Sequence, residues 1–457
     1  MPEKMKRLLL LLCVLGISSG AAVAQQTDGH IWSLEDCMAY AVENSTKVKK
    51  QEYTNDSYRH IRRSAVADML PSLSASASGQ LTTGRGIDPG TNTYSTISNF
   101  GNSYGVYASL PVFNGFALIN KVIETRMQMR SGQSELQRIK DDICLGIVGA
   151  YYDAVYYRQA MGIARDKLER SRQNVYKTKK MEELGLRSEA DVAQMNAALV
   201  ADNFLLVQQE NSYVRAMMSL KDYMNFPTED SLAIDTLMSE KLTILEESPD
   251  RIYEKALATN PTVLRSTYQM EVQKAKYSQA KGRMLPSLSL SGGYSTNYYT
   301  NLTGDRSKVR PFNTQLDQNK GGSLTLSLSI PIFSGLSRRT TLATARNNMR
   351  IAEQENEETR RELRNAIDKA VLERNSQAKQ YYLARQQVES DALAYKAFQR
   401  RYEEGLASSL DVRTSANTLM DSQLKELRAY LYYLLYSCTV DYYNGIPLIS
   451  PEKLASL

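Results

Sequence analysis

The same succession of motifs occurs twice in this chain. Gly185-Leu186-Arg187-Ser188-Glu189-Ala190-Asp191-Val192 returns 220 positions later as Gly405-Leu406-Ala407-Ser408-Ser409-Leu410-Asp411-Val412. Three further landmarks are repeated in the same order at offsets of about 215 to 220: Met69-Leu70-Pro71-Ser72 and Met284-Leu285-Pro286-Ser287, Leu110-Pro111-Val112-Phe113-Asn114-Gly115 and Ile330-Pro331-Ile332-Phe333-Ser334-Gly335, and Asn225-Phe226-Pro227 and Asn444-Gly445-Ile446-Pro447. Any fold proposed for the chain must therefore be built from two copies of one unit.

The N-terminus predicts export from the cytoplasm. Basic residues at Lys4, Lys6 and Arg7 precede an apolar run and the small residues Ala22-Val23-Ala24, which is the pattern of a secretory signal peptide over residues 1–24. Three cysteines remain after it, at wide spacing, which is not the pattern of a disulfide framework. We expect Cys37, Cys144 and Cys438 to be buried helical thiols.

The composition argues against an enzyme and against a nucleic-acid-binding protein. The 56 Lys and Arg exceed the 50 Asp and Glu by six, and this small excess is spread along the chain and forms no basic patch. The two histidines, His30 and His60, have no metal-ligand spacing around them, and no nucleophile motif or phosphate-binding loop is present. The sequence predicts a protein that is not an enzyme and has neither a cofactor nor a metal.

Four segments alternate apolar and small hydroxylated residues with the period of a β-strand. They are expected at about 72–80, 104–113, 286–294 and 322–333, with exposed loops at 81–103 and 295–321 between the members of each pair. One interpretation is a two-layer soluble sheet. The other is the wall of a membrane barrel, which the Ser- and Thr-rich polar face and the lack of a covering layer favour.

The rest of the chain has helical periodicity. Each unit opens with a helix, at 33–68 and at 249–282, and Asn260-Pro261 should interrupt the second. After Gly115 and Gly335 the helical pattern runs for about seventy residues, a rod on the order of 100 Å. An apolar 4-3 spacing marks a coiled-coil seam in the first rod: Ile143, Ile147, Ala150, Ala154, Tyr157, Met161, Ala164 and Leu168.

The repeated Gly-Leu-x-Ser-x-x-Asp-Val motif is expected to form the tip of a helical hairpin in each unit. Glycine ends the first helix with a positive φ, and the serine caps the next helix while the aspartate returns a bond to the serine amide. The expected organisation is a first repeat at 25–226, a linker at 227–250, a second repeat at 251–447 and a tail at 448–457.

Four strands cannot stand alone in a bilayer. The two edges of an open sheet would leave backbone amides and carbonyls unpaired in hydrocarbon. If the strands are lipid-facing, several chains must therefore share one barrel.

The signal peptide, the duplication, the Leu-Pro-Ser stops, the Pro-x-Phe-x-Gly turns and the twin tips resemble the TolC family of outer membrane efflux proteins. The Trp32–Cys37 opening is similar to Bacteroides-like members. The resemblance implies a mainly α fold with a membrane β-barrel portion, in which a homotrimer forms a barrel of twelve strands above a tube of twelve helices. It also implies a location in the outer membrane of a Gram-negative bacterium, with a long extension into the periplasm. The implied partners are a periplasmic adaptor and, through the adaptor, an inner membrane pump of the RND or ABC type.

The resemblance assigns roles to the tips. Gly185, Leu186, Ser188, Gly405, Leu406 and Ser408 match the adaptor-docking tips. Asp191, Tyr402 and Asp411 match positions that close the periplasmic entrance in the type member, whereas Ala407 and Thr414 replace an Arg and an Asp found there. Arg187 and Arg413 are candidates to supply the missing cation. The alternative is that the Ser and Asp pairs serve only as helix caps.

The expected function is the outer membrane duct of a tripartite efflux system. Two alternatives remain open: the duct of a type I protein secretion system, and a barrel-anchored coiled-coil adhesive or structural protein. Drug, metal, bile-type amphiphile and polypeptide cargo remain equally compatible with the sequence.

Overall fold

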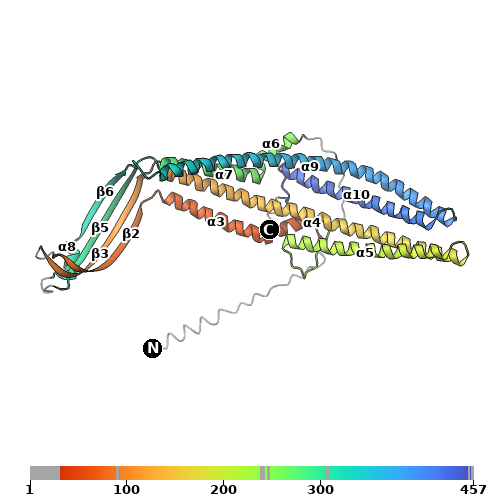
Figure 1. Ribbon diagram of the computed structural model, residues 1–457, viewed down its shortest axis with the longest axis horizontal. Helices are drawn as coiled ribbons and strands as arrows, with labels where there is room; N and C mark the ends of the chain where they lie inside the picture. Colours follow the sequence, from red (N-terminus) through yellow and green to blue (C-terminus); the bar gives the residue numbers. More distant parts are fainter. Residues whose placement is uncertain are drawn as a thin grey trace, which may run out of the picture.

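A computed structural model describes residues 31–88, 92–236, 242–243, 248–303, 309–450 and 453, so the predicted signal peptide lies outside it. The molecule is elongated, with a curled β-sheet at one end, the tips of two helical hairpins at the other and a bundle of helices between them (Figure 1). About 70% of the described residues are helical. The expected mainly α architecture with a strand portion is confirmed.

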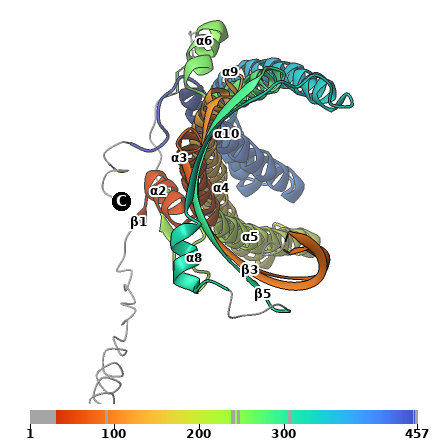
Figure 2. The same cartoon turned by 90° about the vertical axis from the view of Figure 1, so that its left-hand side faces the viewer.

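Among the described residues, the sheet has four antiparallel strands in the order β2-β3-β5-β6. They are β2 (Ser72–Asp88), β3 (Thr93–Phe113), β5 (Ser287–Asn301) and β6 (Gly321–Ser329). Figure 2 shows that the sheet follows an arc when the molecule is viewed end-on. Every residue of β6 is exposed, including Leu324, Leu326 and Leu328, so no layer of the described chain covers either face of this strand.

The strand boundaries correct the sequence-based expectation. The stretch expected as a loop at 81–103 is mostly strand, because β2 and β3 pair continuously from Ser72 with Ser109 to Asp88 with Thr93. Pairing with a neighbour overrides the low β-propensity of Gly and Asn here. The expected loop at 295–321 begins within β5 and contains a short helix, α8 (Phe312–Gln318), and β6 ends at Ser329, short of the expected 333.

The opening helix of each unit is interrupted. The break expected at Asn260 is confirmed, since α6 (Pro249–Thr259) and α7 (Pro261–Gly282) meet there. The first unit is also broken, into α2 (Leu34–Asn44) and α3 (Thr46–Ala67), contrary to the single helix expected. Ser45 lies at the break, where its hydroxyl accepts a bond from the Val48 amide and caps α3.

Two hairpins of very long helices make up the body of the molecule. The outgoing helices, α4 (Ala117–Glu183) and α9 (Ser337–Glu403), are each 67 residues long, which is about 100 Å. The returning helices are α5 (Glu189–Met224) and α10 (Ser409–Tyr443). Gly115, in the turn before α4, has a φ of +64°, and a Cβ there would lie 2.1 Å from the carbonyl oxygen of Gly282.

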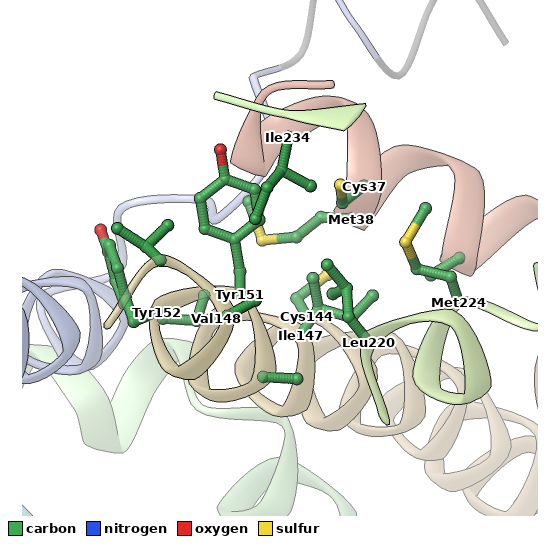
Figure 3. Close-up of a cluster of buried hydrophobic side chains, with 14 of the residues drawn as sticks. Cys37, Met38, Cys144, Ile147, Val148, Tyr151, Tyr152, Leu220, Met224 and Ile234 are labelled. Carbon is green, nitrogen blue, oxygen red and sulfur yellow. The ribbon is translucent and has the colours of Figure 1, made fainter. Parts of the chain in front are cut away.

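The largest buried cluster lies midway along the rods, where α2, α4 and α5 meet (Figure 3). Tyr151 donates its hydroxyl to the carbonyl of Asp235, next to the small parallel pair β1 (Ile31–Trp32) and β4 (Ala233–Ile234). Cys37 and Cys144 are buried in this cluster as expected, and Cys438 is half-buried; none of the three forms a disulfide bond within the described residues. Burial raises the pKa of Cys37 and of Cys144 to about 12.

The helices form a curved layer with two distinct edges. In the half near the sheet the order is α3, α4, α7, α9, and in the half near the tips it is α5, α4, α10, α9 (Figures 1 and 2). α9 therefore forms one edge along its whole length, and α3 and α5 form the other.

Candidate functional site

Each hairpin tip is a left-handed helix cap followed by a new helix. Gly185 has a φ of +73°, and its amide donates to the carbonyl of Glu182 while the Leu186 amide donates to that of Met181, both at 2.8 Å. These two bonds define a Schellman motif, which needs glycine at the positive-φ position. Gly405 and Leu406 repeat the pair with the carbonyls of Tyr402 and Arg401.

The capping boxes predicted after both glycines are present. The Ser188 hydroxyl accepts from the Asp191 amide, and Asp191 in turn accepts from the Ser188 amide and hydroxyl. Ser408 and Asp411 make the same set of bonds in the second tip. The bonds from Ser188 and Ser408 hold the pKa values of Asp191 and Asp411 below the usual range, so both carboxylates are charged at neutral pH.

The tips expose leucine. Leu186 is 65% exposed and Leu406 is 66% exposed, and Leu184 beside them is exposed as well. The glycines and serines fix the backbone below these side chains, while the leucines present apolar surface at the end of a polar rod.

The two tips are bound to one another within the chain, and Arg187 makes the principal contact. Its guanidinium donates to the carbonyl oxygens of Tyr402 (2.6 Å) and Ala407 (3.1 Å) and lies over the Tyr402 ring, 4.1 Å from the centroid. Arg187 therefore satisfies the Tyr402 carbonyl in the last turn of α9, where the helix dipole also favours a cation, and the Ala407 carbonyl in the turn that follows. It approaches Asp191 closely enough to help lower the pKa of that carboxyl.

Tyr402 is the buried half of this contact. It is 3% exposed, and its hydroxyl lies 2.9 Å from that of Thr178, which is fully buried on α4. Val175 and Val412 pack in the same apolar cluster. One side chain of the second hairpin is thus buried against α4 and the tip of the first.

A second connection runs through Asp191. The Ser409 hydroxyl donates to Asp191 Oδ1 at 3.1 Å and lies 2.5 Å from Gln194 Oε1, so the first helical residue of α10 is tied to the first turn of α5. An ion pair between Lys177 on α4 and Glu403 at the end of α9, at 2.5 Å, also joins the two hairpins. We refer to the contacts of Arg187, Asp191, Thr178, Tyr402 and Ser409 as the tip lock.

Asp411 and Arg413 are not brought into the tip lock. Asp411 makes its capping bonds on an exposed surface, and Arg413 is exposed with no charged partner in the part of the chain that the structure describes. The structure thus joins Asp191, Arg187 and Tyr402 and leaves Asp411 and Arg413 apart. Thr178 and Ser409 were missed by the sequence reasoning. Thr178 could have been noticed as a polar residue on the buried side of α4.

A buried polar cluster further up the rods was also missed. Lys167 and Asp202 form an ion pair at 2.8 Å, with only 7% and 9% of their side chains exposed. The Lys167 ammonium also donates to Asn417 Oδ1 at 2.6 Å, and Ser171 donates to Asp202. This cluster links α4, α5 and α10, so it joins the two hairpins above the tip lock.

Neither a metal centre nor a helical membrane anchor is found in the described ranges. No group of three or more His, Cys, Asp and Glu side chains there is placed to hold a metal ion. No helix in the same ranges combines the length and the apolarity needed to cross a bilayer.

Comparison with known proteins identifies relatives with this organisation. The family model described as "Outer membrane efflux protein" matches residues 252–435. The outer membrane efflux protein BepC of Brucella suis is 22% identical over 358 residues, which covers 77% of this chain and 72% of BepC. The outer membrane protein TolC of Vibrio cholerae is 24% identical over 211 residues, or 45% of each chain.

Solved structures share the fold at low sequence identity. The outer membrane protein VceC of Vibrio cholerae superposes with a TM-score of 0.79 at 15% identity, covering 90% of this chain and 96% of VceC. The outer-membrane channel OprN superposes with a TM-score of 0.78 at 16% identity, covering 91% and 90%. The likeness of the Trp32–Cys37 opening to Bacteroides-like members stays a prediction. From its repeats, its fold and these matches, the chain is similar to the outer membrane efflux proteins, whose family model matches its second repeat.

Proposed function

We propose that copies of this chain form the outer membrane duct of a tripartite efflux system. The observation that carries the proposal is the sheet. Its strands are long enough to cross a bilayer, its apolar side chains are exposed on β6 and at positions such as Leu73 and Val106, and it continues directly into rods of about 100 Å. Such rods span much of a periplasm and would continue the barrel as a helical tube.

The open sheet requires partner copies. Among the described residues, β2 and β6 each have one unpaired edge, and unpaired backbone groups are costly in hydrocarbon. Relatives in this family are homotrimeric channels. Three copies of a four-stranded sheet supply twelve strands, enough to enclose a lumen.

The adhesive alternative is less consistent with the chain path. A stalk that presents an adhesive end needs a rod that runs one way, whereas α4 and α9 each return through α5 and α10. Two returning rods per chain are instead what a tube wall of paired helices requires.

The hairpin tips are the proposed docking surface for a periplasmic adaptor, which joins the duct to an inner membrane pump of the RND or ABC type. Gly185, Ser188, Gly405 and Ser408 hold the two turns, and Leu186 and Leu406 provide the apolar contact. Apolar side chains on a rigid turn bind a partner with little loss of conformational entropy.

The tip lock is the proposed gate. Its contacts hold the ends of the two hairpins together within one chain, so they are available to close the periplasmic entrance and must break if the hairpins separate. Of the gate candidates predicted from the sequence, Arg187, Tyr402 and Asp191 belong to it. Asp411 and Arg413 remain gate candidates only through contacts with another copy, and Asp411→Ala should then change the cation preference of single channels in planar bilayers.

The test of function is complementation. Deleting the gene should increase the sensitivity of the host to pump substrates, and the wild-type chain should restore resistance and form ion-conducting channels in planar bilayers. Leu186→Asp with Leu406→Asp should abolish resistance while the purified protein still assembles and conducts. A host whose resistance is unaffected by the deletion, together with a purified chain that forms no channels, would overturn the proposed function.

A further inference from the structure

The sheet has one apolar and one polar face, and the strand pairing shows which residues belong to each. Residues directly opposite one another in an antiparallel pair share a face. One set of pairs joins leucines: Leu288 with Leu328, Leu290 with Leu326, and Leu290 with Leu110. The residues between them are mostly serine, as in the pairing of Ser289 with Ser327. The face that carries the leucines, which we call the apolar face, is the one that would be turned to lipid.

The short helix α8 lies against the apolar face. Tyr298 is on that face, since an even number of positions separates it from Leu290 in β5. Its ring packs on Phe312 of α8, with the ring centroids 5.0 Å apart. The hydroxyl of Thr296, on the same face, donates to the carbonyl of Leu316 at 2.6 Å. Figure 2 shows α8 on the convex side of the curled sheet.

α8 also takes the place of a neighbouring strand. β6 pairs with β5 only as far as Ser295, so the last residues of β5 extend beyond it. There the Gln315 side chain donates to the carbonyl of Tyr299 at 3.0 Å and accepts from its amide at 3.1 Å, as a paired strand residue would. Asn319 donates to the carbonyl of Asn297 at 2.8 Å. These bonds hold α8 in one position on the sheet.

The height of α8 on the strands corresponds to the outer border of a membrane. Tyr298 lies ten positions beyond Leu288, which is at the end of β5 near the rods. At about 3.3 Å per residue and a tilt of roughly 45°, these residues rise about 23 Å, close to the roughly 25 Å of the apolar band of a membrane barrel. Aromatic side chains gather at both borders of such a band, as Tyr298 and Phe312 do here.

Two cations flank α8. Arg310, just before the helix, donates to Gln318 at 2.5 Å, and Lys320, just after it, pairs with the carboxylate of Asp317. Arg310 and Lys320 are both exposed. A guanidinium has five N–H donors and an ammonium has three, so each cation retains donors for a further acceptor.

The strands add almost no charge of their own to this surface. Within β2, β3, β5 and β6 the charged residues are Arg85 and Asp88, both near the far end of β2. The cations beside α8 thus stand at the border of an uncharged apolar face, where the headgroups of the lipids begin. In the outer leaflet of a Gram-negative outer membrane these headgroups belong to phosphorylated glycolipids, whose negative charge complements Arg310 and Lys320.

We propose that α8 binds a phosphorylated glycolipid of the outer leaflet, with Arg310 and Lys320 on its phosphates and Phe312 against its acyl chains. A guanidinium can hold a phosphate through two parallel hydrogen bonds, and an ammonium adds a point charge. The attachment of α8 to β5 places both cations in advance, which lowers the entropic cost of binding. This inference rests on the proposed function, because it requires the sheet to cross the membrane.

Native mass spectrometry of the purified protein tests the phosphate contact. The probes are lipid A with its phosphates, the same lipid after enzymatic removal of the phosphates, and inorganic phosphate. The wild-type chain should retain the phosphorylated lipid in preference to the dephosphorylated one, and inorganic phosphate should not displace it. Arg310→Gln with Lys320→Gln should lower this retention by roughly 5- to 30-fold, the effect of losing two exposed ion pairs.

The matched control removes one lysine and one arginine from the opposite end of the molecule. Lys179→Gln with Arg413→Gln changes exposed cations near the tips and should retain lipid as the wild type does. Equal retention of the two lipids, displacement by inorganic phosphate, or an equal loss in the control variant would overturn the site.

Fluorescence quenching tests the depth of α8 independently of its charges. The chain has a single tryptophan, Trp32, which lies beside the rods far from the sheet. In phosphatidylcholine vesicles with brominated acyl chains, Phe312→Trp should add fluorescence that is quenched most by bromines near the headgroup, while the wild type should not be quenched. Strongest quenching by bromines at the chain ends, or none at all, in a variant that still conducts ions would overturn the lipid site and leave the duct. A wild-type chain that conducts no ions in planar bilayers would overturn the proposed duct, and the lipid site with it.

Discussion

Removal of the Arg187 side chain should open the channel. In each chain this guanidinium donates two hydrogen bonds to carbonyls of the other tip and lies over the buried ring of Tyr402. A hydrogen bond from a charged group contributes about 1.5 to 3 kcal/mol, and a cation over an aromatic ring contributes about 0.5 to 2 kcal/mol. Since Arg187 is only half-buried and water can replace part of these contacts, we discount the set below the sum of the lower limits, to roughly 2 to 3 kcal/mol.

That energy sets the size of the expected change. If the contacts exist only in the locked state, Arg187→Ala lowers the locked-to-open ratio of each chain by roughly 30- to 140-fold, because 1.4 kcal/mol is a factor of ten. Single-channel recording in planar bilayers should show a higher open probability and larger conductance. Arg187→Lys should give an intermediate result, since an ammonium retains the charge but not the planar fork that reaches both carbonyls.

Arg413→Ala is the matched control, because it removes an equally charged side chain from the other tip without removing a contact that holds the tips together within the chain. It should leave conductance unchanged. If Arg187→Ala and Arg413→Ala both behaved as wild type, the tip lock would have no gating role. If only Arg413→Ala opened the channel, the gate would lie between copies and not within one chain.

Three further perturbations test the body of the molecule. Lys167→Met leaves the buried Asp202 carboxylate without its ion-pair partner and should lower the free energy of unfolding by about 3 to 5 kcal/mol. Thermal unfolding in detergent measures this loss. Replacing both Lys167 and Asp202 by apolar residues should recover most of it. Burial raises the pKa of Asp141 from 3.8 to about 6, so the folded state binds its proton more tightly and stability is lost as pH rises from 3.8 to 6. Asp141→Asn should therefore stabilise the protein by roughly 1 to 3 kcal/mol at pH 7.5, and the gain should vanish near pH 4; a gain that grows on acidification would refute this. Gly115→Ala places a Cβ 2.1 Å from a backbone carbonyl and should strongly reduce the yield of folded protein, while Gly149→Ala, which meets nothing within 4 Å, should be neutral or slightly stabilising.

The tips were predictable because their chemistry is local. Gly185 and Ser188 act on residues within five positions, and the same is true of Gly405 and Ser408, so a short motif contains the whole turn and its caps. The partner of Arg187 was not predictable to the same extent. It bonds with residues 215 and 220 positions away, and only the side-by-side placement of the hairpins brings them together.

The sheet shows the same contrast. The alternation of Leu324, Leu326 and Leu328 with Ser and Thr identified a strand, but the extension of β2 to Asp88 depends on the ladder with β3. Gly and Asn in that stretch favour turns, and cross-strand pairing outweighs this preference. The break at Ser45 is a local feature that the sequence reasoning missed, because the helical periodicity on both sides of it continues in register.

The equal length of α4 and α9 constrains how this protein can evolve. Both tips can touch a flat partner at once only if the two rods reach the same depth, and four residues gained in one of them would displace its tip by about 6 Å. Side chains along the rods can drift, as identities of 15–16% to structures of the same fold illustrate. Insertions and deletions within the rods are not tolerated in the same way. A change in the length of α4 must be matched by an equal change in the length of α9. The common length of α4 and α9 therefore sets the distance between the sheet and a partner bound at the tips.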